Sequence, residues 1–345
     1  MKISKILMIG LGLSLAGCPS DDTGDTTGAG SDSTAGATGA TGAEETGATD
    51  AATDDGDTTA GEETAADETE EPPPEVCNGT SEEGAAVGDS CTAHSDCMSG
   101  VCTLYTDVPV NKDAVCAETP ANCGTRVTGT IFDFVTGEPV SGADLVVAAA
   151  LQAATNPTGA MALVEATSDG DGRVDGTSDS AISAPLGIVG LASAGGYFLT
   201  ATGVSAPLED GSSYDVGAGA HDLWIAPTDA LDAWSTALGE AGVAKEDLPL
   251  GENGGAIGMV RGADGVPIAG AVVESTGDSS EAVIRYLNDD GSFGEDSTSD
   301  LGIFVITNPA VPESFQAVLN DNVLGGGTGG SANGAVFTLV ITASE

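Results

Sequence analysis

The fold class of this chain can be read from VTGTIFDFVTGEPVSGADLVV, residues 127–147. This segment combines a short alternating strand, a turn containing Gly and Pro, and a second apolar strand after a Gly-Ala pair. A looser copy, AIGMVRGADGVPIAGAVVES, occupies residues 256–275. Short strands separated by Gly, Asp and Pro turns are typical of antiparallel sandwiches. The chain is therefore predicted to be mainly β, with two antiparallel β-sandwiches at residues 124–227 and 254–345.

Further pairs of segments extend this repeat. ATSDGDGRVDGTSDS at 166–180 matches YLNDDGSFGEDSTSD at 286–300, and AGGYFLTATG at 194–203 matches LGIFVITNP at 301–309. In the opening strands, Ile131 is predicted to correspond to Ile257. Each copy closes on an apolar strand, which is what a sandwich built twice from one plan requires.

The residues between the two copies, 228–253, form a predicted helical connector. Four apolar residues recur there at helical spacing: Leu231, Trp234, Leu238 and Val243. Thr228 or Asp229 can cap the start of this helix. We expect Trp234 to pack against a sheet, and the helix to hold the two sandwiches relative to one another.

The first residues of the chain form a predicted export signal. Lys2 and Lys5 precede an apolar run too short to span a bilayer, and the run ends in Leu15-Ala16-Gly17-Cys18. With a cysteine directly after the small pair, residues 1–17 resemble a bacterial lipoprotein signal peptide with the lipobox LAGC. The resemblance implies that Cys18 becomes a lipidated N-terminus carrying palmitate or similar chains. The membrane partner would then be the bacterial outer membrane or cell surface.

Residues 18–76 form a predicted disordered acidic linker behind the lipid anchor. Positions 19–76 consist almost wholly of Asp, Glu, Thr, Ser, Ala and Gly, and they contain no Lys, Arg or aromatic residue. Such a segment cannot bury enough apolar surface to offset its ordering entropy. We expect it to be a spacer between the membrane and the folded part.

Six of the seven cysteines lie in one short segment, residues 77–123. They are Cys77, Cys91, Cys97, Cys102, Cys116 and Cys123. An even number of cysteines in an exported chain predicts three disulfides, with 15 connectivities open. A zinc site fits poorly, because the segment has no Cys-x-x-Cys pair. The string DSCTAHSDCMSGVC resembles Dickkopf-like cysteine-rich modules, which also occur in surface lipoproteins of myxobacteria.

The opening pattern of the first copy, G-x-x-x-D-x-x-T-G-x-P-V-x-G-A, resembles the carboxypeptidase regulatory-like domain. The second copy matches less well, since Ala263-Asp264-Gly265-Val266-Pro267 replaces the Thr-Gly-Glu-Pro turn. The resemblance implies prealbumin-like sandwiches, grouped with carbohydrate-binding-like modules, and a non-catalytic accessory or display role. It says nothing about a specific ligand, since one sandwich scaffold hosts many roles.

Composition restricts the partners. Eight Lys and Arg stand against 54 Asp and Glu, which gives a formal net charge of -46. So acidic a chain has no basic footprint for nucleic acid, and we expect no nucleic-acid partner. An aromatic content of 4% favours thin sandwiches with many turns over a large enzyme core.

The loop Asp169-Gly170-Asp171-Gly172-Arg173-Val174-Asp175 is a candidate calcium site. Alternating carboxylates on a glycine turn can converge on Ca²⁺, with Asp169, Asp171 and Asp175 as ligands. Arg173 occupies what would be a ligand position, however, and Asp and Gly are also preferred by any tight turn. No other cofactor is expected.

An enzymatic function is not expected. The chain has only two histidines, His94 and His221, which leaves too few for a His-rich metal centre and little choice for the base of a hydrolase triad. The sequence instead predicts a lipid-anchored envelope protein that displays non-catalytic modules for binding or adhesion, with a protein or glycan ligand. One alternative is a carbohydrate-binding protein, for which the candidate aromatic residues are Tyr197, Tyr214, Trp224 and Tyr286. The other is a structural subunit of an envelope complex.

Overall fold

The computed structural model describes residues 76–345, apart from 109, 209–211, 278–279 and 345. The predicted signal at residues 1–17, the lipidation site Cys18 and all of the predicted linker except Val76 lie outside the described residues. Within the described part, no helix is long and apolar enough to span a bilayer.

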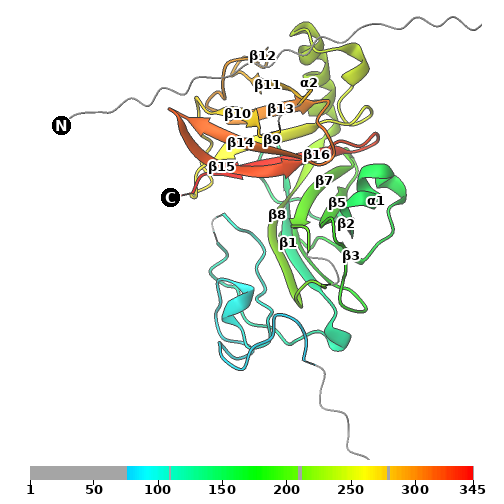
Figure 1. The fold of residues 1–345 in the computed structure, drawn as a ribbon, viewed down its shortest axis with the longest axis vertical. Helices are drawn as coiled ribbons and strands as arrows, with labels where there is room; N and C mark the ends of the chain where they lie inside the picture. The colour runs from blue at the N-terminus through cyan, green and yellow to red at the C-terminus, as the bar shows by residue number, and fades with distance from the viewer. Residues whose placement is uncertain (1–75, 109, 209–211, 278–279, 345) are drawn as a thin grey trace, which may run out of the picture. The chain divides into compact units, whose positions relative to one another are not determined.

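The described chain is mainly β, as predicted (Figure 1). The strands of the first copy are β1 (Arg126–Asp133), β2 (Asp144–Ala149), β3 (Val164–Thr167), β4 (Arg173–Thr177), β5 (Ile188–Ser193), β6 (Tyr197–Phe198), β7 (Thr200–Ser205) and β8 (Gly217–Pro227). Those of the second are β9 (Ala256–Arg261), β10 (Val272–Ser275), β11 (Val283–Leu287), β12 (Phe293–Gly294), β13 (Ile303–Thr307), β14 (Glu313–Leu319), β15 (Asn322–Gly329) and β16 (Val336–Thr342). The α-helices are α1 (Ala150–Thr155) and α2 (Thr228–Glu240). Short 3₁₀ turns occur at His94–Asp96, Ala121–Cys123, Pro157–Gly159 and Lys245–Asp247.

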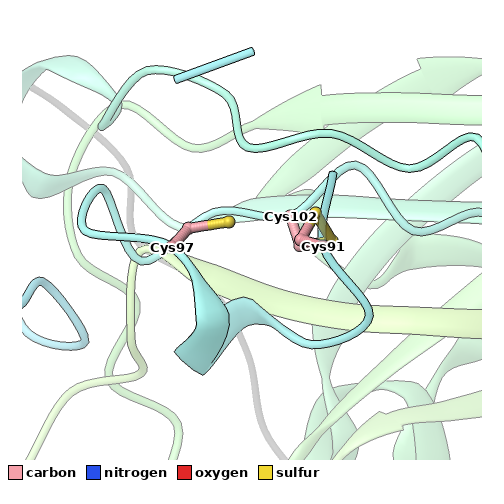
Figure 2. Close-up of side chains that lie close together, drawn as sticks. All are labelled: Cys91, Cys97 and Cys102. Carbon is pink, nitrogen blue, oxygen red and sulfur yellow. A yellow bond between two sulfur atoms is a disulfide. The ribbon is translucent and has the colours of Figure 1, made fainter. Parts of the chain in front are cut away.

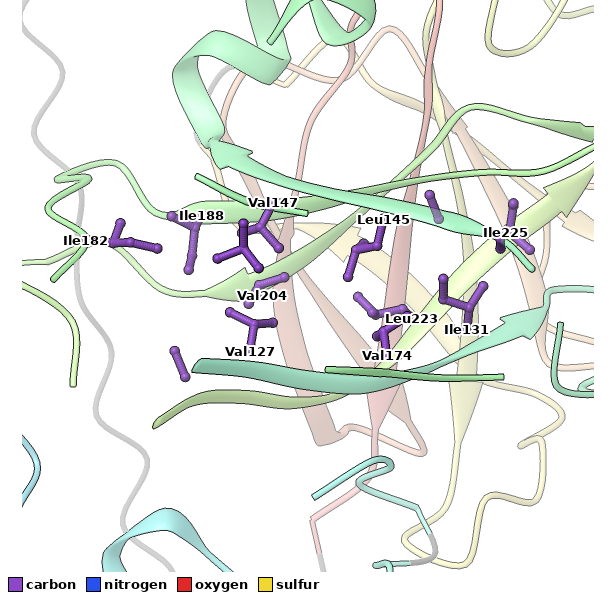
Figure 3. Close-up of a cluster of buried hydrophobic side chains, with 14 of the residues drawn as sticks. Val127, Ile131, Leu145, Val147, Val174, Ile182, Ile188, Val204, Leu223 and Ile225 are labelled. Carbon is purple, nitrogen blue, oxygen red and sulfur yellow. The ribbon is translucent and has the colours of Figure 1, made fainter. Parts of the chain in front are cut away.

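The first copy is a sandwich of two layers. One layer has the strand order β4-β1-β8-β6, and the other has the order β7-β5-β2-β3. Apolar side chains of the two layers point toward one another and fill the space between them (Figure 3). Ile131, Leu145 and Leu223 are among those almost completely buried in this core. The short apolar strands and the Gly, Asp and Pro turns between them are what predicted this sandwich from sequence alone, although β1 and β5 are buried over most of their length.

The second copy repeats this plan. Its layers have the orders β12-β11-β13-β9-β16 and β10-β14-β15. A second core, which includes Val260, Phe304 and Phe315, lies between them. In both copies the opening strand lies between an antiparallel neighbour and the closing strand, which runs parallel to it. The first and last strands of each copy therefore lie side by side in one layer.

Equivalent hydrogen bonds define the register of the repeat. The Ser168 hydroxyl accepts the Ala143 N–H at 2.9 Å, and the Thr298 hydroxyl accepts the Ala271 N–H at 2.9 Å. Each hydroxyl also donates to a backbone carbonyl just upstream of that alanine. Residues 168–177 thus correspond to 298–307.

This register corrects the sequence alignment of the two copies. The predicted match of 166–180 with 286–300 is wrong, because the Asn-Asp-Asp-Gly turn near residue 290 joins β11 to β12, a hairpin outside this correspondence. The match of 194–203 with 301–309 is wrong as well, because β13 corresponds to β4. Likewise Ile131 corresponds to Val260 rather than to Ile257. Each donates its N–H to the carbonyl of the glycine in the equivalent turn of its own copy, at 2.9 Å. Acidic glycine turns resemble one another wherever a strand reverses, so composition alone misplaced the match.

The two copies share one sheet. Strand β16 of the second copy pairs in parallel with β7 of the first, which joins two layers into a sheet of nine strands (Figure 1). The Thr202 and Thr338 hydroxyls hydrogen-bond across this seam at 2.7 Å. Backbone pairing thus makes the link between the copies continuous.

Helix α2 packs through its apolar stripe against residues of both copies. Leu231, Trp234 and Leu238 are buried in a cluster that also contains residues of β8, β9 and β13. The Trp234 ring meets the Phe134 ring edge-on, with centroids 6.2 Å apart, so the expectation that Trp234 packs in the core is confirmed. The helix begins at Thr228, and its N-cap is Pro227 rather than the predicted Thr228 or Asp229. Asp229 nevertheless accepts the Ala230 N–H of the first turn, at 2.9 Å.

Candidate functional site

The cysteine module, residues 77–123, is held by three disulfides, and the disulfide prediction is confirmed. The pairs are Cys77–Cys123, Cys91–Cys102 and Cys97–Cys116. Its small core consists largely of these cysteines together with Leu104 and Ala114. A segment with so little apolar side-chain volume depends on cross-links for its stability.

Three sulfur atoms of this module lie close together without forming a metal site. In the described part of the chain, Cys91, Cys97 and Cys102 are the one group of three or more potential ligands gathered within 4.8 Å. Figure 2 shows Cys91 beside Cys102, with the Cys97 sulfur directed toward them. All three sulfurs belong to disulfides, so none is available as a thiolate ligand.

The module lies against strands β1 and β8 of the first sandwich. The Val216 N–H donates to the Asn78 carbonyl at 3.0 Å, and the Asn78 side chain donates to the Ser213 hydroxyl at 2.9 Å. Further along, the buried Thr128 hydroxyl of β1 donates to the Leu104 carbonyl. The loop that follows Leu104 is thereby brought over the sandwich, where it lines two cavities.

The first cavity, here called the junction, contains a buried ion pair. It has a volume of about 360 Å³ and is lined by residues of the cysteine module and of both copies. Arg261 of β9 and Asp222 of β8 meet in it at 2.7 Å, and their side chains are only 8% and 4% exposed. Arg261 also donates from Nε to the Thr342 hydroxyl at 3.2 Å.

The cysteine module completes the coordination of that ion pair. The Thr106 hydroxyl and the Asp107 backbone N–H, the latter at 3.3 Å, both donate to Oδ1 of Asp222. Taking two charges out of water is offset only where hydrogen bonds occupy their remaining positions. Each buried charge at the junction has such partners, so the arrangement is suited to holding three segments together.

Two titratable groups at the edge of the junction do not form an ion pair at neutral pH. His221 Nδ1 lies 3.7 Å from Asp107 Oδ2. Burial lowers the pKa of His221, which leaves the imidazole neutral at pH 7. Burial and the Asp222 charge raise the pKa of Asp107 to about 6, against the opposing effect of Arg261. The carboxyl of Asp107 is therefore in an unfavourable place when ionised.

The second cavity, here called the Tyr105 cleft, has a different lining. Its volume is about 600 Å³, and its wall includes Tyr105, Phe132, Asn111, Lys112, Asp171 and Arg173. The guanidinium of Arg173 lies over the Tyr105 ring, 4.9 Å from the centroid. Two aromatic rings and two cations thus face one cleft in a chain that is otherwise strongly acidic.

Arg173 differs from every other arginine beyond the predicted signal. Arg126, Arg261 and Arg285 each pair with a carboxylate, at 2.6 to 2.8 Å. Arg173 forms no ion pair with any described residue, and neither does the cleft residue Lys112. A cation that forms no ion pair, in a cleft of ligand size, is a feature that an anionic ligand would use.

The predicted calcium loop has the role of holding Arg173 in this position. Oδ1 of Asp169 accepts the N–H groups of Asp171 and Arg173, both at 2.9 Å, which closes the turn. Asp175 forms a two-point contact with Arg126 at 2.6 and 2.8 Å. The three carboxylates Asp169, Asp171 and Asp175 are not gathered into one group of potential ligands. Calcium binding by this loop stays a prediction.

The aromatic residues proposed from sequence as sugar platforms lie elsewhere and are mostly buried. Tyr214, Trp224 and Tyr286 are at most 7% exposed, and the two tyrosine hydroxyls bond to backbone groups. Tyr197 is partly exposed and donates to Asp133 at 3.0 Å. Tyr105 and Phe132, which line the cleft, were not identified, because their partners come from segments far apart in sequence.

The histidines have structural surroundings. The partly buried His94 ring accepts the Cys102 N–H at 3.0 Å through Nδ1, and burial lowers the pKa of the imidazole. A β-carbon on Gly217 would lie 2.4 Å from that ring, so the module and β8 are closely packed here. In the described residues neither histidine hydrogen-bonds to a hydroxyl or a carboxylate, the arrangement that nucleophilic catalysis needs.

Comparison with known proteins gives only distant matches. No family model matches the chain, and no curated protein matches it. Among solved structures, the shaft pilin SpaA of Lactobacillus rhamnosus GG is 10% identical, covers 64% of this chain and 98% of its own, and has a TM-score of 0.19. A minor pilin of Streptococcus agalactiae is 14% identical and covers 64% of this chain and 95% of its own, also with a TM-score of 0.19. Similarity at this level does not define the function of the chain.

Proposed function

We propose that this chain is a lipid-anchored protein of the bacterial cell surface that displays a non-catalytic β-structured body for binding or adhesion. In this proposal Cys18 carries the lipid, and residues 18–76 are the spacer. The body consists of the cysteine module (77–123), the sandwich regions 124–227 and 254–345, and the connector 228–253.

The observation that carries the proposal is the set of three disulfides inside one short module. Such cross-links persist in oxidising compartments, which supports export of the chain. The lipobox-like Leu15-Ala16-Gly17-Cys18 adds retention at the membrane, since two or more acyl chains give stable anchoring. The shared sheet and the buried ion pair at the junction favour a body that keeps its shape while exposed outside the cell.

Lipidation and surface display can be tested together in a bacterial host with an outer membrane. The full chain and a Cys18→Ser variant would be expressed in the presence of radiolabelled palmitate, with Ser20→Ala as the control. We expect label and membrane retention in the parent and the control, and loss of both in Cys18→Ser. Protease added to whole cells should degrade the parent. An unlabelled parent, or Cys18→Ser that remains equally firmly in membranes, would contradict the proposal.

A further inference from the structure

We propose that the Tyr105 cleft binds an acidic glycan, a sugar chain that carries uronic acid carboxylates. This inference rests on the proposed binding role of the body and names its ligand class. It starts from the cations. Arg173 and Lys112 line one cleft and form no ion pair with a described residue, whereas the other three arginines are each paired with a carboxylate.

The charges around the cleft favour an anionic ligand. The chain contains 54 acidic residues, so a carboxylate partner for Arg173 could easily have been supplied from within. The nearest loop acids are engaged otherwise, since Asp169 closes a turn and Asp175 is paired with Arg126. Two cations against the single carboxylate of Asp171 give the cleft wall a local excess of positive charge. Arginine is the side chain best suited to bind a planar carboxylate at two points.

The remaining lining selects for a sugar rather than an acidic peptide. Tyr105 and Phe132 are partly exposed and offer ring surface to the apolar face of a pyranose. Asn111 and Asp171 offer an amide and a carboxylate to sugar hydroxyls, which both donate and accept hydrogen bonds. An acidic peptide would bring its carboxylates toward Asp171 without hydroxyl donors to offset the repulsion. A volume of about 600 Å³ has room for two or three sugar rings.

Specific contacts hold both the backbone and the guanidinium of Arg173 in position. Its backbone N–H is fixed by Asp169, and its guanidinium is held over the Tyr105 ring. The aromatic face places the cation without neutralising it, so its hydrogen-bond donors stay available to a ligand. Such preorganisation reduces the entropy that a ligand must overcome on binding.

The test is calorimetric titration of the full mature chain in nonionic detergent. The probes are tri-galacturonate, neutral tri-galactose and the peptide tri-glutamate. We expect tri-galacturonate to bind at least tenfold more tightly than either of the others, and its affinity to fall as salt is raised. No binding of tri-galacturonate at millimolar concentration, or equal binding of the neutral sugar, would overturn the proposal. Tighter binding of tri-glutamate would replace the sugar with an acidic peptide.

Matched variants locate the site. Arg173→Gln should weaken tri-galacturonate binding about tenfold to a hundredfold, the usual range for a lost charge-assisted hydrogen bond. Lys112→Gln, at an exposed position where folding is not at stake, should weaken it severalfold. Arg285→Gln removes an arginine outside the cleft lining and should leave the affinity unchanged. Equal losses of affinity for tri-galacturonate in all three variants would indicate an effect of net charge and would contradict binding at the Tyr105 cleft. Failure here would leave the palmitate experiment unaffected, so the two proposals can be rejected separately.

Discussion

The junction and the Tyr105 cleft are built from the same loop of the cysteine module, yet they treat an arginine in opposite ways. At the junction, Arg261 is almost completely buried and bonded to Asp222 and Thr342. At the cleft, Arg173 is partly exposed, its guanidinium lies over the Tyr105 ring, and it forms no ion pair with a described residue. A buried charge with all its partners connects parts of a fold, whereas a positioned but unpaired charge is available to a ligand.

The largest effect is expected from breaking the junction. Arg261→Met leaves the Asp222 carboxylate buried without its counter-charge, and the free energy of unfolding should fall by about 3–5 kcal/mol. The control is Arg285→Met, whose partner Glu295 is 72% exposed. Because Glu295 stays in contact with water when the arginine is removed, this pair is expected to contribute only about 0–1 kcal/mol. Urea denaturation of both variants measures the difference. Similar decreases in the free energy of unfolding would contradict the claim that the buried pair at the junction stabilises the fold more than the Arg285–Glu295 pair.

The next effect comes from two equivalent glycines. Gly172 and Gly302 have φ of +76° and +67°, and a β-carbon on either would lie 2.8 or 2.9 Å from the β-carbon of a proline, Pro139 or Pro267. Replacing either by Ala should therefore lower the free energy of unfolding by about 1–3 kcal/mol. Only Gly172→Ala disturbs the turn that holds Arg173, so only this variant should also lose affinity for tri-galacturonate. Equal affinity in both variants would show that the turn does not position the arginine.

The two sandwiches could be predicted from the sequence, but the register of the repeat could not. The opening motif and the Gly-Ala pair predicted two sandwiches, because strand alternation and turn residues are local signals. The correspondence of Ser168 with Thr298 was missed, since their shared role is a hydrogen bond to the backbone near a distant alanine. No local sequence pattern marks such a bond. The acidic glycine turns of the two copies have similar compositions, and they were therefore aligned with each other although they are not equivalent.

The two cavities were beyond sequence reasoning for a related reason. Arg261 and Asp222 lie in different copies, and Tyr105 and Arg173 lie in different modules. Each pair is brought together only by the packing of the cysteine module and of the shared sheet. The Asp169 loop was recognised as a site for charge, but its sequence could not show that it presents a cation of the protein itself.

A smaller, pH-dependent effect is expected from Asp107. Its pKa is about 6 in the folded chain and near its ordinary 3.8 when unfolded, so the folded state binds more protons between these values. Stability should therefore fall as the pH rises from about 4 to about 6, and the loss should persist above pH 6. The side chain is 51% exposed, so the effect is smaller than for a buried group.

Asp107→Asn removes this contribution. The variant should melt at a higher temperature than the parent at pH 7 and at the same temperature near pH 4. His221, whose pKa is lowered by burial, favours folding as the pH rises toward 6.5, but this contribution is common to both proteins and cancels. A parent that is the more stable at pH 7 would mean that Asp107 forms a favourable contact with His221 at the junction edge.

The smallest effect is expected from calcium at the Asp169 loop. The sequence predicts a melting temperature that rises with millimolar calcium and falls with chelator, with oxygen ligands from Asp169, Asp171 and Asp175. In the structure Asp175 is paired with Arg126, and calcium would have to displace that arginine. Arg126→Gln should therefore strengthen the response to calcium, and Asp171→Asn should remove it. If neither the parent nor Arg126→Gln changes its melting temperature with calcium, the loop serves only to hold Arg173 at the cleft.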